Sequence, residues 1–142
     1  MAASNPPSLT PGQRRILAAL RASKTPLTAY AVLEVLRQER AGAAPPSAYR
    51  ALNRLMALGL VHRLESLNAY IACEHHHHGE HALFLICDDC GVVTERIDPG
   101  FSRGLSALAA TVDFAPQVSM VEIHGQCPVC RGSRNDHAPP QT

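Results

Sequence analysis

The sequence predicts an α+β fold in two parts, three short helices with a hairpin followed by strands that carry paired cysteines. Three observations predict it. Apolar residues recur at helical spacing up to residue 59, and shorter strand-like runs follow. Two Cys-x-x-Cys pairs lie in the second half. Formal charge divides as well, because residues 9–63 hold nine Lys or Arg against two acids, and residues 64–130 hold two Arg against nine acids. This asymmetry favours a polyanionic partner for the first half and another task for the second.

The composition is that of a globular protein. The chain has 142 residues, enough for one domain or two small ones, and 46% of them are hydrophobic. No run approaches the roughly 18 apolar residues of a membrane span, and the N-terminal MAASNPPSLTPGQRR lacks the order of a signal peptide. We therefore expect a cytoplasmic protein without a membrane partner. In that compartment thiols stay reduced, and Cys-x-x-Cys pairs bind metal more often than they form disulfides.

Three helices are expected in the first half. Thr10 can cap the first, with Pro11 in the first turn and Gln13 completing a capping box. A second helix is expected over residues 28–40 and a third over residues 47–59, separated by a segment rich in Gly and Pro. The side chains expected to face inward are Ile16, Leu17, Leu20, Val32, Leu33, Leu36, Leu52, Leu55 and Met56.

Two short strands, residues 60–66 and 68–73, are expected next, joined by a Ser-Leu-Asn turn. Three helices and a hairpin in this order are typical of a winged helix-turn-helix, whose third helix enters the major groove of double-stranded DNA. Arg and Asn are suited to bidentate contacts with guanine and adenine, and other basic residues to phosphate contacts. The exposed positions of the third helix carry Tyr49, Arg50, Asn53 and Arg54, and the phosphate candidates are Arg14, Arg15, Lys24 and Arg63. The alternative is a small helical core with a basic exterior.

The two Cys-x-x-Cys pairs follow strand-like runs, LFLI and MVEI, and each lies at a sharp turn. Two such knuckles on neighbouring strands would supply four thiolates, Cys87, Cys90, Cys127 and Cys130, the tetrahedral set that a structural zinc prefers. Such a closed site stabilises folding and does no chemistry. The 36 residues between the pairs leave room for a helix over residues 101–112 and another strand. A thioredoxin-like redox role fits two pairs at strand ends less well.

A second set of ligand-type residues surrounds the junction of the two halves. His62 lies on the first hairpin strand, Cys73 ends the second, and His81 and Glu95 follow. Two imidazoles, a thiolate and a carboxylate favour zinc over magnesium or calcium. Taken singly, each residue has a simpler explanation: Cys73 can be a buried small hydrophobe, and His62 can lie near DNA phosphate.

The motifs TAYAVLEVLR, PPSAYRALNRLMALGLVHRLESLNAYIAC, FLICDDCGVVTE and EIHGQCPVC resemble the Fur family of metalloregulators, most closely its zinc-uptake-regulator (Zur) branch. The resemblance covers roughly residues 9–130. It implies an N-terminal winged helix-turn-helix DNA-binding domain, residues 1–73, followed by a small α/β dimerisation domain with a four-cysteine zinc site, residues 74–130. Residues 131–142 form a polar, Pro-containing tail that we expect to be disordered.

The resemblance also implies a role for each candidate residue. Two zinc ions per subunit are expected, a structural one on Cys87, Cys90, Cys127 and Cys130 and a regulatory one on His62, Cys73, His81 and Glu95. Glu80 or His78 could replace His81. DNA contacts would fall on Tyr30, Tyr49 and Arg50. A third metal site could be built from His75, His76, His77, His78, Glu122 and His124, or the histidine run could be a loose loop that scavenges zinc.

The function implied is that of a zinc-responsive transcriptional repressor, which binds operator DNA as a homodimer when zinc-loaded and represses zinc-uptake genes. An iron-responsive Fur-type regulator is the alternative within the family, against which Cys73 argues. A zinc carrier or a metalloenzyme with a water held by His62, His81 and Glu95 belongs to a different class. A thiolate as fourth ligand would close the position that a substrate needs, so we expect no catalysis and no small-molecule substrate.

Overall fold

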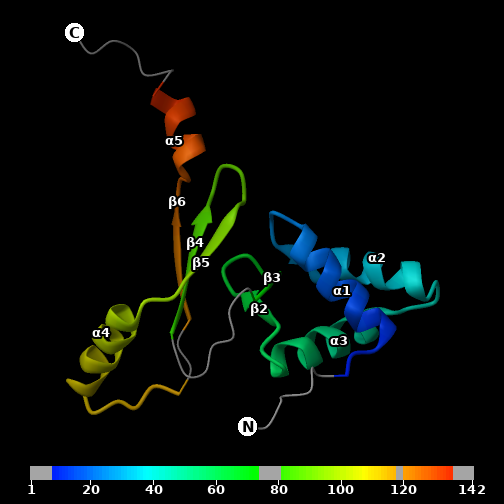
Figure 1. Ribbon diagram of the computed structural model, residues 1–142, viewed down its shortest axis with the longest axis horizontal. Helices are drawn as coiled ribbons and strands as arrows, with labels where there is room; N and C mark the ends of the chain where they lie inside the picture. The colour runs from blue at the N-terminus through cyan, green and yellow to red at the C-terminus, as the bar shows by residue number, and fades with distance from the viewer. Residues whose placement is uncertain (1–7, 74–80, 118–119, 136–142) are drawn as a thin grey trace, which may run out of the picture. The chain divides into compact units, whose positions relative to one another are not determined.

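The computed structural model describes residues 8–73, 81–117 and 120–135. The chain divides into two compact units, Met1–His76 and His77–Thr142 (Figure 1). Each unit has its own sheet, and no strand of one pairs with a strand of the other among the described residues. Within the same residues, no helix is long and apolar enough to cross a membrane.

The first unit contains three helices and a three-stranded sheet. Its elements are α1 (Pro11–Ala22), β1 (Leu27–Thr28), α2 (Ala29–Glu39), α3 (Pro45–Ala57), β2 (Val61–Leu64) and β3 (Ala69–Ala72). The strands pair antiparallel in the order β1-β3-β2, which confirms the predicted hairpin and adds β1 to its edge. The sequence did not indicate β1, because a two-residue strand has no periodicity from which to recognise it.

The helix starts agree with the predicted capping, with one exception. The Thr10 hydroxyl accepts a hydrogen bond from the Gln13 backbone N–H, and the Gln13 side chain accepts one from the Thr10 N–H. Helix α3 begins at Pro45 rather than at the predicted residue 47. Pro45 and Pro46 fit the first turn of a helix, where no backbone N–H is needed. The helix therefore begins at Pro45, and it has no side-chain cap.

The core of the first unit lies between the three helices and the hairpin. Ile16, Val32, Leu52 and Leu55 are completely buried, and Tyr70 of β3 joins the same cluster. Burying one such aliphatic side chain stabilises a fold by about 1.5–3 kcal/mol. All the side chains predicted to face inward belong to this cluster, although Met56 is only partly buried. The first unit therefore has a hydrophobic core of its own.

The second unit is built on a three-stranded sheet with a helix inserted between its strands. Its elements are β4 (Ala82–Cys87), β5 (Val93–Arg96), α4 (Pro99–Ala110), β6 (Met120–Gly125) and α5 (Pro128–Asn135). Strand β4 is central, antiparallel to β5 and parallel to β6. A parallel pair needs a long crossover connection, and the segment containing α4 supplies it. The predicted helix between the cysteine pairs and the neighbouring strands before them are thus confirmed.

Helix α5 corrects one prediction. We expected residues 131–142 to be disordered, but α5 continues to Asn135 and follows directly from β6 (Figure 1). Pro128 starts the helix, and the Arg131 N–H donates to the Cys127 carbonyl, so the turn of the second cysteine pair continues as a helix. Residues 136–142 lie outside the described part of the chain.

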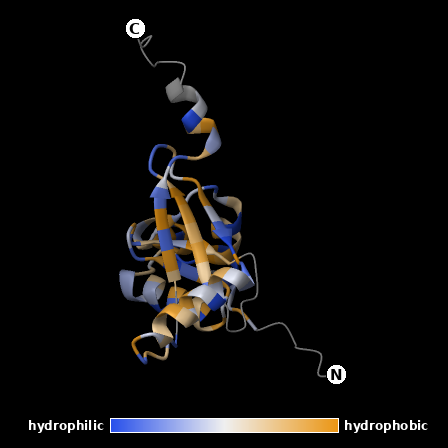
Figure 2. Cartoon of the chain, turned by 90° about the vertical axis from the view of Figure 1, so that its left-hand side faces the viewer, coloured by the Kyte–Doolittle hydropathy of each residue, from blue (hydrophilic) through white to orange (hydrophobic). Residues whose placement is uncertain are grey.

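The second unit exposes much of its apolar surface. No α4 residue is buried, and Figure 2 shows apolar colouring along the strands and on α4. The large apolar side chains of this unit that are exposed are Leu85, Leu108, Val112, Phe114, Met120, Ile123 and Val129. By contrast, Phe84 and Ile86 on the central strand are buried. An apolar surface of this extent is typical of a protein interface.

Replacing Leu52 by Ala should destabilise the first unit by about 2–5 kcal/mol, because a completely buried side chain leaves a cavity. Urea denaturation followed by circular dichroism would measure the loss. The same change at Leu67, in the hairpin turn and 37% exposed, should cost less than about 1 kcal/mol. Equal losses in the two variants would contradict the core assignment.

Candidate metal centres and nucleic-acid interface

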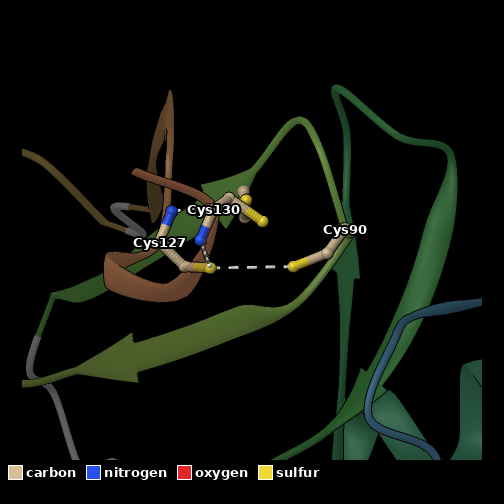
Figure 3. A group of neighbouring side chains, drawn as sticks. Cys90, Cys127 and Cys130 are labelled. Carbon is tan, nitrogen blue, oxygen red and sulfur yellow. Dashed lines mark hydrogen bonds between the residues drawn. The ribbon is translucent and has the colours of Figure 1, made fainter. Parts of the chain in front are cut away.

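The four predicted thiol ligands meet at one edge of the second sheet. Strands β4 and β6 run parallel with Cys87 beside Gly125, so the two cysteine pairs leave the sheet at the same end. The four sulfur atoms all lie within 4.8 Å of one another. Figure 3 shows Cys90 and Cys127 facing each other, with 3.8 Å between their sulfurs. The structure thus brings together the four cysteines that the sequence singled out.

The geometry of this cluster fits zinc. Two thiolates bound at about 2.3 Å to one tetrahedral zinc lie about 3.8 Å apart, which is the separation of Cys90 and Cys127. Hydrogen bonds from the backbone N–H groups, first that of Cys127 and then that of Cys90, lower the pKa of Cys87 to about 6. The neighbouring Cys127 thiol, and then burial, raise the pKa of Cys130 to about 12. Cys87 is therefore a thiolate at neutral pH, and zinc would displace the remaining protons as it binds.

Polar contacts cross-link the two cysteine pairs outside the sulfur cluster. The His124 Nδ1 lies 2.7 Å from the Asp88 carboxylate, and the Gln126 amide donates to Asp89 over 2.6 Å. The Asp88 N–H also donates to the Gly125 carbonyl. The sequence did not reveal these contacts, because the four side chains are common surface types and meet only when β4 and β6 pair. They hold both knuckles in position for a metal.

The predicted recognition surface is exposed on the first unit. Arg50, Asn53 and Arg54 are exposed along α3, and Tyr49 is 49% exposed. Tyr30, at the start of α2, is 72% exposed. Long basic and aromatic side chains on one accessible helix suit major-groove contacts.

All three predicted phosphate-contacting arginines are engaged within the protein, Arg14 with the nearby Leu9 carbonyl over 2.6 Å and the other two with side chains. Arg15 forms an ion pair with Glu39 over 2.8 Å and so connects α1 to α2. Arg63 donates to the Asn68 side chain over 2.8 Å, across the hairpin turn. Asn68 has a positive φ of 47°, a conformation that Asn tolerates better than most residues. These two side chains stabilise the first unit whether or not they also contact DNA.

His62 and Cys73 are brought together by the hairpin register. His62 lies opposite Ile71, and Cys73 follows two residues later on the same face, with its N–H donating to the Leu60 carbonyl. The ligand atoms of His62 and Cys73 lie within 4.8 Å of each other. The first unit therefore offers an imidazole and a thiol side by side.

In the second unit, His81 directly precedes β4, and Glu95 lies on β5 opposite Phe84. Both side chains are half-buried. The Nδ1 atom of His81 is buried and has no hydrogen-bond partner among the described residues. A buried ring nitrogen of this kind fits a metal ligand, because coordination would satisfy its lone pair.

The residues suggested for a third metal site are only partly described. His75, His76, His77, His78 and Glu80 lie outside the described residues. His124 contacts Asp88, and Glu122, on β6, lies opposite Phe84 of β4. Among the described residues of the second unit, the four cysteines are the one group of three or more ligand-type side chains brought this close together.

Replacing Cys130 by Ser should lower both the zinc content and the thermal stability of the second unit, because metal binding contributes directly to folding free energy. Native mass spectrometry would count the zinc ions, and thermal melts would measure the stability. Cys73→Ser is the matched control for stability, since it changes the same atom outside the four-cysteine cluster and should leave the melting temperature of the second unit nearly unchanged. Equal loss of melting temperature in both variants would contradict the assignment of the cluster as a structural site.

Comparison with known proteins identifies the family of this chain. The model of the Ferric uptake regulator family matches residues 8–124. The zinc uptake regulation protein of Escherichia coli (strain K12) is 36% identical over 123 residues, which cover 86% of this chain and 72% of that protein.

Two solved structures are similar over most of their length. A zinc uptake regulator complexed with zinc and DNA has a TM-score of 0.84 at 33% identity, covering 90% of this chain and 86% of that chain. Holo XcZur has a TM-score of 0.76 at 40% identity, covering 87% and 86%. The chain belongs to the Ferric uptake regulator family.

Proposed function

We propose that this protein is a zinc-responsive transcriptional repressor that binds operator DNA when zinc-loaded and represses zinc-uptake genes. The observation that carries the proposal is the combination of an exposed basic recognition helix in one unit with zinc-type ligands in both. The similarity to a zinc uptake regulation protein and to a regulator solved with zinc and DNA supports it.

Zinc has two separate tasks in this proposal. A structural zinc is held by the four cysteines at the ends of β4 and β6, a closed thiolate site that leaves no position for a substrate. A regulatory zinc is held by His62, Cys73, His81 and Glu95. The close approach of His62 to Cys73 and the buried Nδ1 of His81 support this second set.

A homodimer provides the two DNA-reading surfaces. The exposed apolar side chains of β4, β6 and α4 support dimerisation through the second unit, since a second copy would cover them. A cavity of about 270 Å³ beside the cysteine cluster, lined by Leu85 and Ile123 among others, belongs to the same surface. In such a dimer, each subunit presents one α3 helix to a half-site of double-stranded DNA.

Regulation depends on the division of the regulatory zinc ligands between the two units. His62 and Cys73 belong to the DNA-binding unit, and His81 and Glu95 to the other unit. A zinc ion bound by both pairs restricts how the two units are oriented and so favours one separation of the two recognition helices. Zinc would then shift the population toward dimers whose spacing matches the operator. A coupling of about 1–3 kcal/mol changes operator affinity roughly 5–150-fold.

An iron-responsive regulator is the alternative within the same family. The thiolate of Cys73 beside His62 favours zinc, because thiolate and imidazole ligands together suit zinc. Harder cations prefer sites that are rich in oxygen ligands. We assign no catalytic role to either metal site.

Genomic DNA fragments should be enriched by the purified protein at high buffered zinc and not at low zinc, because zinc selects the DNA-competent dimer. Sequencing of the retained fragments would identify an inverted-repeat site. Cys73→Ser should keep the fold but lose this zinc-dependent enrichment. Enrichment only in a parallel iron-loaded sample would identify the protein as an iron-responsive regulator. Enrichment with neither metal would refute the regulator function.

Replacing Arg50 by Ala should weaken binding to the selected site by about 1–3 kcal/mol and relax its sequence preference, because a bidentate contact with a base is lost. Fluorescence anisotropy at several salt concentrations would measure both effects. Arg131→Ala removes the same charge from the other unit and should leave affinity nearly unchanged. An equal loss in the two variants would mean that overall charge, and not base recognition, determines the affinity.

A further inference from the structure

Helix α4 holds His81 by two contacts that the sequence did not indicate. The His81 backbone N–H donates to the Ser102 hydroxyl oxygen over 3.2 Å. The ring Nε2 of the same histidine lies 3.4 Å from the hydroxyl oxygen of Ser106, one helical turn further along α4. The first contact positions the main chain, and the second meets the imidazole ring itself.

The two ring nitrogens of His81 differ in their surroundings. Nε2 has the Ser106 hydroxyl as a partner, whereas Nδ1 is buried without a hydrogen-bond partner among the described residues. A neutral imidazole carries its proton on one nitrogen and a lone pair on the other. A proton on Nδ1 would be buried without an acceptor among the described residues. A proton on Nε2 can be donated to the Ser106 oxygen, and the Nδ1 lone pair is then available to a cation.

We propose that Ser106 is a positioning residue for the regulatory zinc: its hydroxyl accepts the Nε2 proton of His81 and thereby presents Nδ1 as the ligand atom. The inference rests on the proposed function, since it concerns a ligand of the proposed regulatory site. A hydrogen bond to the second nitrogen of a metal-bound histidine fixes the tautomer and the ring orientation and increases the basicity of the ligand. Ser106 thus influences the zinc concentration at which the repressor responds.

The contact also gives α4 a part in sensing. Ser102 and Ser106 lie one turn apart, so the same helix holds both the backbone and the ring of His81. Helix α4 has no buried residue of its own, and its serines connect it to the residue that directly precedes the central strand. A change in the position of α4 would therefore reach a zinc ligand through these two hydroxyl groups.

Zinc affinity and ring tautomer can be measured separately in the full-length protein. Competition with a fluorescent zinc chelator would give the affinity for the second zinc ion in wild type, Ser106→Ala, Ser106→Thr and His81→Ala. Long-range proton–nitrogen NMR correlations would identify the protonated ring nitrogen of His81. Zinc retention by the four cysteines and the melting temperature would verify that each variant is folded.

The expected result is a loss of roughly 10–100-fold in affinity for the second zinc in Ser106→Ala, with near wild-type affinity in Ser106→Thr, which keeps the hydroxyl. Zinc-loaded wild type should carry the His81 proton on Nε2. Ser102→Ala separates the two contacts: it removes the hydrogen bond to the His81 backbone but should leave the proton of the ring on Nε2.

Two results would overturn the inference, and they differ from failure of the proposed function. Wild-type affinity in Ser106→Ala would exclude a positioning role, and a proton on Nδ1 in the zinc-loaded protein would exclude Nδ1 as the ligand. Wild-type affinity in His81→Ala would instead remove His81 from the regulatory site. That outcome would refute the ligand set itself and, with it, the role of Ser106.

Discussion

The parallel pairing of β4 with β6 is the constraint on which the second unit depends. It brings Cys87 beside Gly125, so that two cysteine pairs separated by a helix and two strands emerge at one edge of the sheet. Few described side chains of this unit are buried, chiefly Phe84 and Ile86 at about 1.5–3 kcal/mol each. Structural zinc sites contribute about 10–16 kcal/mol in small metal-binding domains. A zinc ion at the four cysteines would therefore contribute more to the stability of this unit than these two buried side chains.

The first unit is stabilised differently. Its helices and hairpin share a continuous aliphatic core, so the recognition helix is held in place without a metal. This difference would separate the two roles of zinc in the proposed function. Metal at the four cysteines would maintain the second unit, whereas metal at His62 and Cys73 would act on a unit that is already folded. A regulatory ion could then be lost and regained without unfolding the DNA-binding surface.

Much of the fold and of the candidate sites could be predicted from the sequence. The capping box at Thr10, the apolar stripes and the paired cysteines depend on residues close in sequence, and the structure agrees with them. The start of α3, the strand β1 and the extent of α5 were not predicted. Proline permits a helix to begin earlier than the polar cap suggests, β1 is too short to carry a pattern, and α5 grows from a turn fixed by the second cysteine pair.

The sequence by itself determined which residue types are available: four cysteines in two knuckles, a basic helix with Arg50 and Asn53, and a histidine and a cysteine on the two arms of one hairpin. Only the tertiary structure decided which other side chains contact the candidate sites. Asp88 meets His124, and Ser106 meets His81, across separations of 36 and 25 residues. Local sequence patterns carry no information about such contacts, because they exist only after strand pairing and helix packing have brought distant segments together.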